Sequence, residues 1–320
     1  IHPTGRGSGQ PTGPDSDGAY RFKHVLTQEV TYDSLLEHQR RSLHELVGRA
    51  IEREHAAALD PQAQILAHHF GCAEAWSEAV QYGRRAAGRA SALNQFADAL
   101  SMLDRVLGWV MQLRADSARS ELLADVLLQQ ERLCETLGER GRQQQIVDQL
   151  ITHLAPLGPS ERLAQAYLRQ GDLCTLLRRF DAADRALGTA LRLGSERGDA
   201  TLERHALRSL GLLRWHEERH EEALEITERA LAIDRGRGDD LAVAGDLANL
   251  GMILKSMGDY PRALASLQEA LAIPALGREP AALVYDLQNI ANVHRALGDL
   301  PAALEYLRRA DEISRTHLLS

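Results

Sequence analysis

The sequence contains few aromatic residues, few lysines and few cysteines, and each scarcity narrows the class of protein. Aromatic residues make up 4% of the 320 residues, and the lysines are Lys23 and Lys255. The three cysteines, Cys72, Cys134 and Cys174, are odd in number and far apart, unlike the framework of a small disulfide-rich secreted domain. We therefore expect three core thiols in a reducing, cytoplasmic compartment.

Positive charge and long apolar runs are also lacking. The formal net charge of −8 offers no general attraction for a polyanion, so the composition does not favour nucleic acid as a partner. No segment approaches the roughly 20 consecutive apolar residues that a membrane span needs. What is present is a 44% hydrophobic content, dominated by aliphatic residues and alanine, which is typical of an all-α protein.

The chain opens on Ile1, without an initiator methionine or a signal-peptide pattern, in a run rich in glycine, proline and serine. We expect a piece of a longer protein, with a flexible loop over residues 1–19. Gly5, Gly7 and Gly9 follow no strand that could present them as a phosphate-binding turn. The PDSDG segment at 14–18 lacks the closing glutamate of a calcium loop and is interpreted as a turn.

Four segments of the C-terminal half repeat with a period of 40 residues. Each carries small residues separated by 12 and then 7 positions, in the sets Gly171, Ala183, Ala190; Gly211, Ala223, Ala230; Gly251, Ala263, Ala270; and Ala291, Ala303, Ala310. Large apolar residues flank them at helical spacing, four residues before the leading small residue (Tyr167, Leu207, Leu247, Leu287) and, with Thr227 as the exception, four after the first alanine. This pattern predicts two amphipathic helices per repeat, which approach closely at the small residues.

Short turns separate the two helices of each repeat. In MGDY at 257–260 and LGDL at 297–300, the glycines Gly258 and Gly298 fit a left-handed C-cap and the following aspartates fit an N-cap. The segment DLANLGMILKSMGDYPRALASLQEALAI resembles the tetratricopeptide repeat. The usual period of that repeat is about 34 residues, so the present one resembles the longer variant of kinesin light chains, and HEAT repeats rank second.

The resemblance implies an all-α, TPR-like α-solenoid, a right-handed superhelix of helical hairpins. Four regular hairpins are expected over 159–320 and an irregular TPR-like array over 61–158, with a break at PLGPS, residues 156–160. Such an array is a binding surface, so we expect no enzymatic activity and no cofactor in this chain.

Residues 20–60 resemble a connector of larger signalling proteins. The resemblance is carried by Phe22, His24, Leu26, Gln28, Glu29, Tyr32, Leu35, Arg40, Arg41, Leu43 and His44. This spacing is similar to the end of the winged-helix part in bacterial STAND-class signalling ATPases, in particular those joined to an adenylate or guanylate cyclase and a tetratricopeptide tail. Residues up to about 113 extend the likeness. No GxxxxGK[ST] phosphate loop occurs, so the ATPase or cyclase of such a protein would lie N-terminal to Ile1.

Two histidine motifs were weighed as metal sites. His216 to His220 spell H-E-x-x-H, which binds zinc when it lies on one helix. In the repeat frame the motif straddles a turn, with Glu218 at the glycine position, so we expect no zinc there. The neighbours His68 and His69 point about 100° apart on a helix and are interpreted as packing residues.

Polar residues of the first helix of each repeat are the candidate binding residues. Certain kinesin-light-chain-like repeats carry an asparagine two residues before the leading small residue, and Asn249 and Asn289 occupy that position, although Arg169 and Ser209 replace it earlier. By register, the same concave surface should hold Asn292, Lys255, Arg295, Arg208, Trp215, Tyr285 and Asp172. The alternative is that these are solvated helix residues.

The sequence predicts a sensor or scaffold arm of a cytoplasmic signalling protein that binds a peptide or a partner domain in its concave groove. Self-assembly into a homo-oligomer is the second interpretation, and the effector domain of a transcriptional regulator is a variant of the first.

Overall fold

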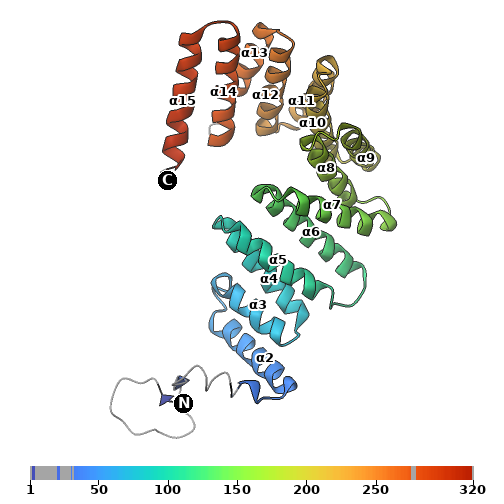
Figure 1. Ribbon diagram of the computed structural model, residues 1–320, viewed down its shortest axis with the longest axis vertical. Helices are drawn as coiled ribbons and strands as arrows, with labels where there is room; N and C mark the ends of the chain where they lie inside the picture. Colours follow the sequence, from blue (N-terminus) through green and yellow to red (C-terminus); the bar gives the residue numbers. More distant parts are fainter. Residues whose placement is uncertain (1, 4–19, 22–29, 31, 275–278, 319–320) are drawn as a thin grey trace. The chain divides into compact units, whose positions relative to one another are not determined.

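The computed structural model describes residues 2–3, 20–21, 30, 32–274 and 279–318. The chain divides into two compact units, Ile1–Leu137 and Gly138–Ser320, which are drawn in Figure 1. The predictions for Gly5, Gly7, Gly9, the turn at 14–18 and the segment 22–29 lie outside the described residues. The domain boundary predicted near 158 stays a prediction.

The described residues of unit 1 form helices and one two-residue antiparallel pair, β1 (His2–Pro3) with β2 (Tyr20–Arg21). Its helices are α2 (Glu37–Glu54), the 3-10 turn η1 (Asp60–Gln62), α3 (Ala63–Cys72), α4 (Trp76–Ala92), α5 (Phe96–Val110) and α6 (Ser117–Leu137). Each of the helices α2 to α6 packs on the next one along the chain. The winged-helix assignment of residues 20–60 remains a prediction.

Unit 2, residues 138–320, is a series of helical hairpins. Its elements are α7 (Arg140–Leu154), the 3-10 turn η2 (Ala155–Leu157), α8 (Glu161–Leu176), α9 (Phe180–Arg197), α10 (Ala200–His216), α11 (His220–Arg237), α12 (Asp240–Ser256), α13 (Tyr260–Leu271), α14 (Pro280–Ala296) and α15 (Leu300–Leu318). The four predicted repeats correspond to the hairpins α8–α9, α10–α11, α12–α13 and α14–α15. The predicted all-α, TPR-like α-solenoid is confirmed.

In the first three repeats the leading glycine lies where the two helices of a hairpin approach closely. A Cβ atom added to Gly171 would come within 2.4 Å of Leu187, and one added to Gly251 within 2.5 Å of Leu267. At Gly211 the opposing residue is Thr227, whose hydroxyl would lie 2.6 Å from the added carbon. Thr227 is buried without cost because its Oγ1 donates a hydrogen bond to the carbonyl of Ala223 (2.8 Å). The predicted reason for the small residues is confirmed.

The turns within the hairpins use left-handed backbone at one fixed repeat position. Gly258 and Gly298 have φ of +81°, as the sequence predicts, while Arg178 and Glu218 take φ of 58° and 63° at the equivalent positions. The aspartate that follows each glycine caps the next helix, since Asp259 accepts a hydrogen bond from the backbone N–H of Arg262 (3.2 Å). The turn is therefore kept even where glycine is not.

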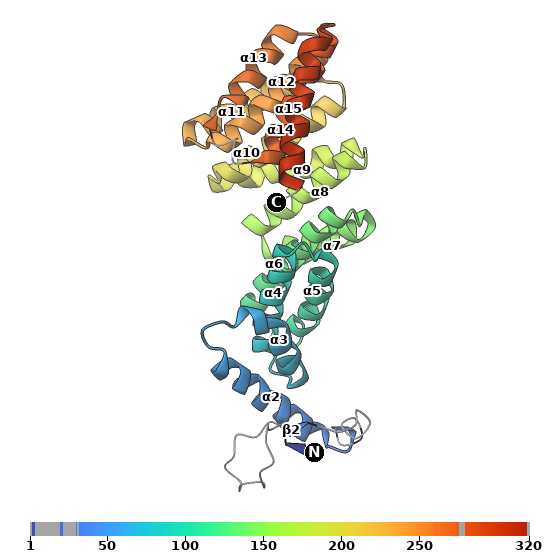
Figure 2. The ribbon, with the colours of Figure 1, turned by 90° about the vertical axis from the view of Figure 1, so that its left-hand side faces the viewer.

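Successive hairpins meet mainly where the second helix of one packs on the first helix of the next, as α9 does on α10, α11 on α12 and α13 on α14, and the first helices also contact one another. Besides packing on its own partner, α8 contacts α10, α10 contacts α12 and α12 contacts α14. Over the described residues, the second helices α9, α11, α13 and α15 make no comparable contact with one another. In Figure 2 the hairpin α10–α11 lies directly beside α12–α13. Because the first helices crowd together and the second helices splay, the first helices form the inner surface of unit 2.

The core of unit 1 gathers around a few aromatic residues. Leu66, Phe70 and Tyr82 are buried, and the rings of Phe70 and Tyr82 stack at 5.6 Å. Trp109 covers Gly71 and Gly83, because a Cβ on either glycine would come within 3.0 Å of its indole ring.

Within the described residues, no helix is long and apolar enough to cross a membrane.

Candidate binding surface and histidine clusters

The predicted binding residues all lie on the first helices of the four hairpins. Asp172 belongs to α8, Arg208 and Trp215 to α10, Asn249 and Lys255 to α12, and Tyr285, Asn289, Asn292 and Arg295 to α14. Of the nine, Tyr285 and Arg295 are exposed and the other seven are half-buried. Their placement by helix agrees with the register, while their role in binding remains a prediction.

Arg208 is engaged within the fold. Its Nε donates to Oδ1 of Asp246 on α12 (2.8 Å), and its guanidinium also donates to the carbonyl of Ala242 (3.0 Å). Asp234 on α11 lies 3.7 Å from Arg208 and 3.1 Å from Arg204, and both aspartates are fully buried. Burial raises the pKa of Asp246 to about 6, although Arg208 opposes the rise. This network fastens α10 to its neighbours.

Trp215 and Tyr285 also reach across neighbouring first helices. The indole N–H of Trp215 on α10 donates to the hydroxyl of Ser256 at the end of α12 (2.9 Å), and that hydroxyl donates to the carbonyl of Met252. The hydroxyl of Tyr285 on α14 lies 3.8 Å from the sulfur of Met252. These side chains present polar and aromatic edges on the inner surface while they hold its helices in register.

The two repeat asparagines are half-buried on α12 and α14. Among the described residues, Nδ2 of Asn289 is buried and has no hydrogen-bond partner. Three residues further along α14, Asn292 accepts a hydrogen bond from Arg295 (3.3 Å). A buried amide donor without a partner costs about 1–3 kcal/mol, which sets Asn289 apart from the other eight predicted residues, for which no such unpaired buried atom is found among the described residues.

A separate hollow of about 390 Å³ lies between α7, α8 and α9. Polar groups that line it include Gln144, Gln170, Arg179 and Arg185, and the thiol of Cys174 lies among them. None of the nine predicted residues lines this hollow, so it is distinct from the surface of α10, α12 and α14.

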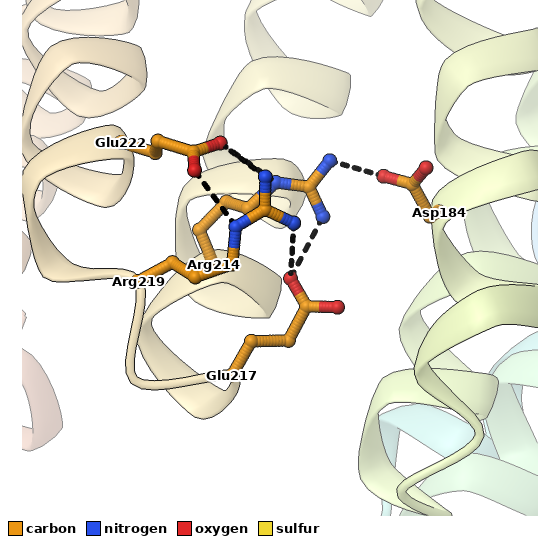
Figure 3. A network of polar contacts seen from close by, with 5 residues as sticks. All are labelled: Asp184, Arg214, Glu217, Arg219 and Glu222. Carbon is orange, nitrogen blue, oxygen red and sulfur yellow. Dashed lines mark hydrogen bonds and ion pairs between the residues drawn. The ribbon is translucent and has the colours of Figure 1, made fainter.

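The H-E-x-x-H segment has the geometry of a turn. His216 ends α10 and His220 begins α11, so the histidines do not share one helical face. The glutamate of the motif, Glu217, lies 2.9 Å from the guanidinium of Arg214 and 3.2 Å from that of Arg219. Figure 3 shows these three residues in a network that also takes in Asp184 of α9 and Glu222 of α11. The motif therefore spans the turn between two helices and does not lie on one helix as a zinc-binding H-E-x-x-H does. Its glutamate is paired with two arginines.

A different histidine cluster escaped the sequence analysis. His44 on α2 and His68 and Cys72 on α3 place one ligand atom each within 4.8 Å of one another. The signal that could have found it is the spacing H-x-x-x-C from 68 to 72, which puts both groups on one helical face. The third member comes from another helix, which the sequence does not place.

The fold and this surface together define a TPR-like helical-repeat protein. The tetratricopeptide repeat family model matches residues 203–275 and 241–316, two overlapping stretches that cover α10 to α15. No curated protein matches the sequence.

Solved structures of similar fold cover most of the chain. The apo form of RapI has a TM-score of 0.67 at 14% identity over 88% of this chain and 99% of its own. BtubC (BKLC) from P. vanneervenii has a TM-score of 0.59 at 21% identity over 69% and 92%. A Rap protein complexed with competence and sporulation factor has a TM-score of 0.57 at 13% identity over 91% and 98%. At these identities the likeness establishes the fold alone.

Proposed function

We propose that the chain is a protein-interaction module that binds an extended peptide segment along the inner surface formed by α8, α10, α12 and α14. The observation that carries the proposal is the buried, unpartnered Nδ2 of Asn289, which stands at the repeat position that Asn249 occupies one hairpin earlier.

The chemistry of a carboxamide suits this role. It offers a donor and an acceptor side by side and can pair with both the C=O and the N–H of one peptide unit. Packed helix axes lie about 8–10 Å apart, and an extended chain advances about 3.3 Å per residue. Asn249 and Asn289 would thus contact peptide units about three residues apart, and the aromatic edges of Trp215 and Tyr285 would border the side chains between them.

Two of the comparisons support this assignment by analogy. One Rap structure of similar fold is complexed with competence and sporulation factor, and the tetratricopeptide repeat family model matches residues 203–275 and 241–316. We propose no covalent step, and the described residues of the inner surface offer hydrogen-bond donors and acceptors for a peptide.

The test compares the wild-type chain with an Asn249→Ala/Asn289→Ala variant that circular dichroism shows to be folded. Both are used in pull-downs from lysate of the source cell and against a peptide array. A bound peptide should lose about 10- to 100-fold in affinity in the double variant, because the two lost amide pairings together are worth about 1–3 kcal/mol.

The matched control replaces two exposed residues of the outer helices, Glu225 and Gln268, by alanine. This variant should bind like the wild type. Equal retention of the partner by the wild type and by the asparagine variant would move the binding surface away from α12 and α14.

Self-assembly is a second candidate, favoured by one observation on α15. Leu300, Leu304 and Leu307 of this helix are 58%, 53% and 45% exposed, and together they make an apolar strip. If α15 packs on a second copy, the mass measured by light scattering should rise with concentration, and Leu304→Glu should abolish the rise. A constant monomeric mass would eliminate this candidate.

We further propose that the module serves a multidomain bacterial signal-transduction protein of the STAND type, in which groove occupancy biases an ATPase or nucleotide cyclase. This proposal rests on the resemblance of residues 20–113 alone. The coding sequence upstream of Ile1 tests it. A phosphate-loop ATPase there would support the proposal. A DNA-binding domain would instead favour the effector domain of a transcriptional regulator. If the upstream sequence encodes neither of them, both contexts are eliminated.

A further inference from the structure

The geometry points to a zinc site in unit 1, in which we propose that His44, His68 and Cys72 bind a Zn²⁺ ion, with the fourth position taken by His69 or water.

The donor set has the composition and spacing of a zinc site. Imidazole nitrogen and thiolate sulfur are the ligands that zinc prefers, at about 2.0–2.1 Å and 2.3 Å respectively. These lengths place the donors of a tetrahedral site about 3.3–3.8 Å apart. Here Sγ of Cys72 lies 3.9 Å from both ring nitrogens of His68, and the donors of all three residues lie within 4.8 Å of one another. Small rotations of the exposed side chains of His68 and Cys72 would close the site.

The helices hold two of the ligands before any metal arrives. His68 and Cys72 are four residues apart on α3, so they project from the same face, one turn apart. The packing of α2 on α3 supplies His44, because the ring of Phe70 on the buried face of α3 touches Gly48 on α2. A Cβ on Gly48 would lie 3.0 Å from that ring, so the close approach of the two helices depends on glycine at this position.

Neighbouring side chains are placed to orient the first histidine. Nε2 of His44 lies 2.8 Å from the hydroxyl of Tyr32, and its Nδ1 lies 2.9 Å from Nδ1 of His69. A metal-bound histidine is commonly fixed by a hydrogen bond at its other ring nitrogen. Tyr32 would hold Nε2 in this way, which leaves Nδ1 of His44 to the metal. The separation of 2.9 Å between Nδ1 of His44 and Nδ1 of His69 is that of a hydrogen bond, which the metal would replace.

Metal binding at this site is coupled to the release of a proton. A zinc-bound cysteine is a thiolate, so the Cys72 thiol must lose its proton to the solvent when the metal binds. Coordination balances as Zn²⁺ plus the thiol giving the zinc thiolate plus one proton, and affinity should therefore fall as the pH is lowered.

The experiment uses the full chain without a histidine tag, stripped with a chelator and titrated with Zn²⁺ and, separately, with Co²⁺. The wild type should take up one equivalent of zinc against a competing chromogenic chelator. The cobalt form should show the intense near-ultraviolet band of a thiolate bound to cobalt together with the visible bands of tetrahedral coordination.

Three variants separate the site from general binding. Cys72→Ser should remove the thiolate band. His68→Ala and His44→Ala should each weaken zinc binding at least tenfold, the lower end of the 10- to 100-fold loss of metal affinity that follows even from mutation of residues around the ligands. His38→Ala, on the exposed face of α2, and Cys174→Ser, in unit 2, serve as controls and should bind like the wild type. Circular dichroism of the metal-free variants establishes that they remain folded.

Two results would overturn the proposal. One is the absence of stoichiometric zinc from the wild type. The other is zinc uptake that Cys72→Ser and His68→Ala leave unchanged, which would identify adventitious binding elsewhere.

Discussion

The guanidinium of Arg208 on α10 donates from Nε to Oδ1 of Asp246 on α12 at 2.8 Å, which joins the first helices of two successive hairpins through a fully buried carboxylate. The same guanidinium lies over Gly245, where an added Cβ would be 3.4 Å from Nη2 of Arg208. The contact is part of the interior of unit 2, although Arg208 itself is about a third exposed.

Loss of the Arg208 guanidinium should destabilise the fold strongly. We expect Arg208→Met to lower the free energy of unfolding by about 3 kcal/mol, because it leaves Asp246 buried with its main cationic partner removed. Urea unfolding followed by circular dichroism measures the change. The control is Arg235→Met, whose partner Glu269 is 54% exposed, and which should cost less than about 1 kcal/mol. Equal losses in the two variants would show that burial of this pair has no energetic weight.

The helix contacts at the small residues predict opposite effects for two glycine substitutions. Gly251→Ala should destabilise by about 1–3 kcal/mol, because the new methyl group would lie 2.5 Å from the buried Leu267. Gly188→Ala, on the exposed face of α9 with no atom within 4 Å of the added carbon, should stabilise by about 0.5–1 kcal/mol through helix propensity. Thermal unfolding of both variants tests the sign, and a gain for Gly251→Ala would contradict the packing argument.

Glu218 is strained where its counterparts in later repeats are glycines. Its φ of 63° is a left-handed conformation that costs an ordinary residue about 1–2 kcal/mol. Glu218→Gly should therefore raise the free energy of unfolding by about 1 kcal/mol, part of the relief being offset by the greater freedom of glycine in the unfolded chain. Glu221→Gly, three residues on within α11, should lower it by about 1 kcal/mol. Chemical denaturation of both variants gives the comparison.

Asp286 should make stability depend on pH. Burial raises its pKa from 3.8 to about 6, so the folded state binds the proton more tightly than the unfolded state. The free energy of unfolding gains its full contribution from this proton below about pH 4 and loses it as the pH rises through about 6. At pH 7 the ionised carboxylate costs up to roughly 3 kcal/mol, from a shift of about two pKa units.

Asp286→Asn should thus stabilise the protein by about 1–3 kcal/mol at pH 7, and the gain should shrink at pH 5. Urea unfolding at the two pH values, beside Asp311→Asn on the exposed face of α15, checks this. A gain that is the same at both pH values would mean that Asp286 does not titrate in this range.

The periodicity of the sequence predicts the repeat architecture well because it records steric contacts directly. Gly171, Gly211 and Gly251 each stand against a side chain sixteen positions later, and the substitution of Leu by Thr227 is compensated locally through the carbonyl of Ala223. The turn conformation persists at Arg178 and Glu218, where the residue type alone gives no sign of it. The position within the 40-residue repeat determines which residue adopts the left-handed conformation, and the packing of the two flanking helices stabilises that conformation.

The candidate sites depend on contacts between helices that the sequence does not order in space. Arg208 fits a surface position by register, but its partner Asp246 lies 38 residues away and draws it into the interior. Similarly, His68 and Cys72 are visible as a pair on one helix, while His44 reaches them only because α2 packs on α3. Side-chain partnerships across helices therefore lie beyond what spacing along one helix can predict.

The equivalence of the turns at residues 178, 218, 258 and 298 has a consequence for how such a protein can change length. Each hairpin packs on the next through the same kind of interface. One 40-residue segment could therefore be gained or lost between two turns, because the flanking helices would still pack on a helix of the same type. The pair of Arg208 with Asp246 is an exception, because it makes the interface between α10 and α12 chemically different from the other interfaces. The inner surface can thus grow in steps of forty residues, and the order of the hairpins is marked by a few buried charges.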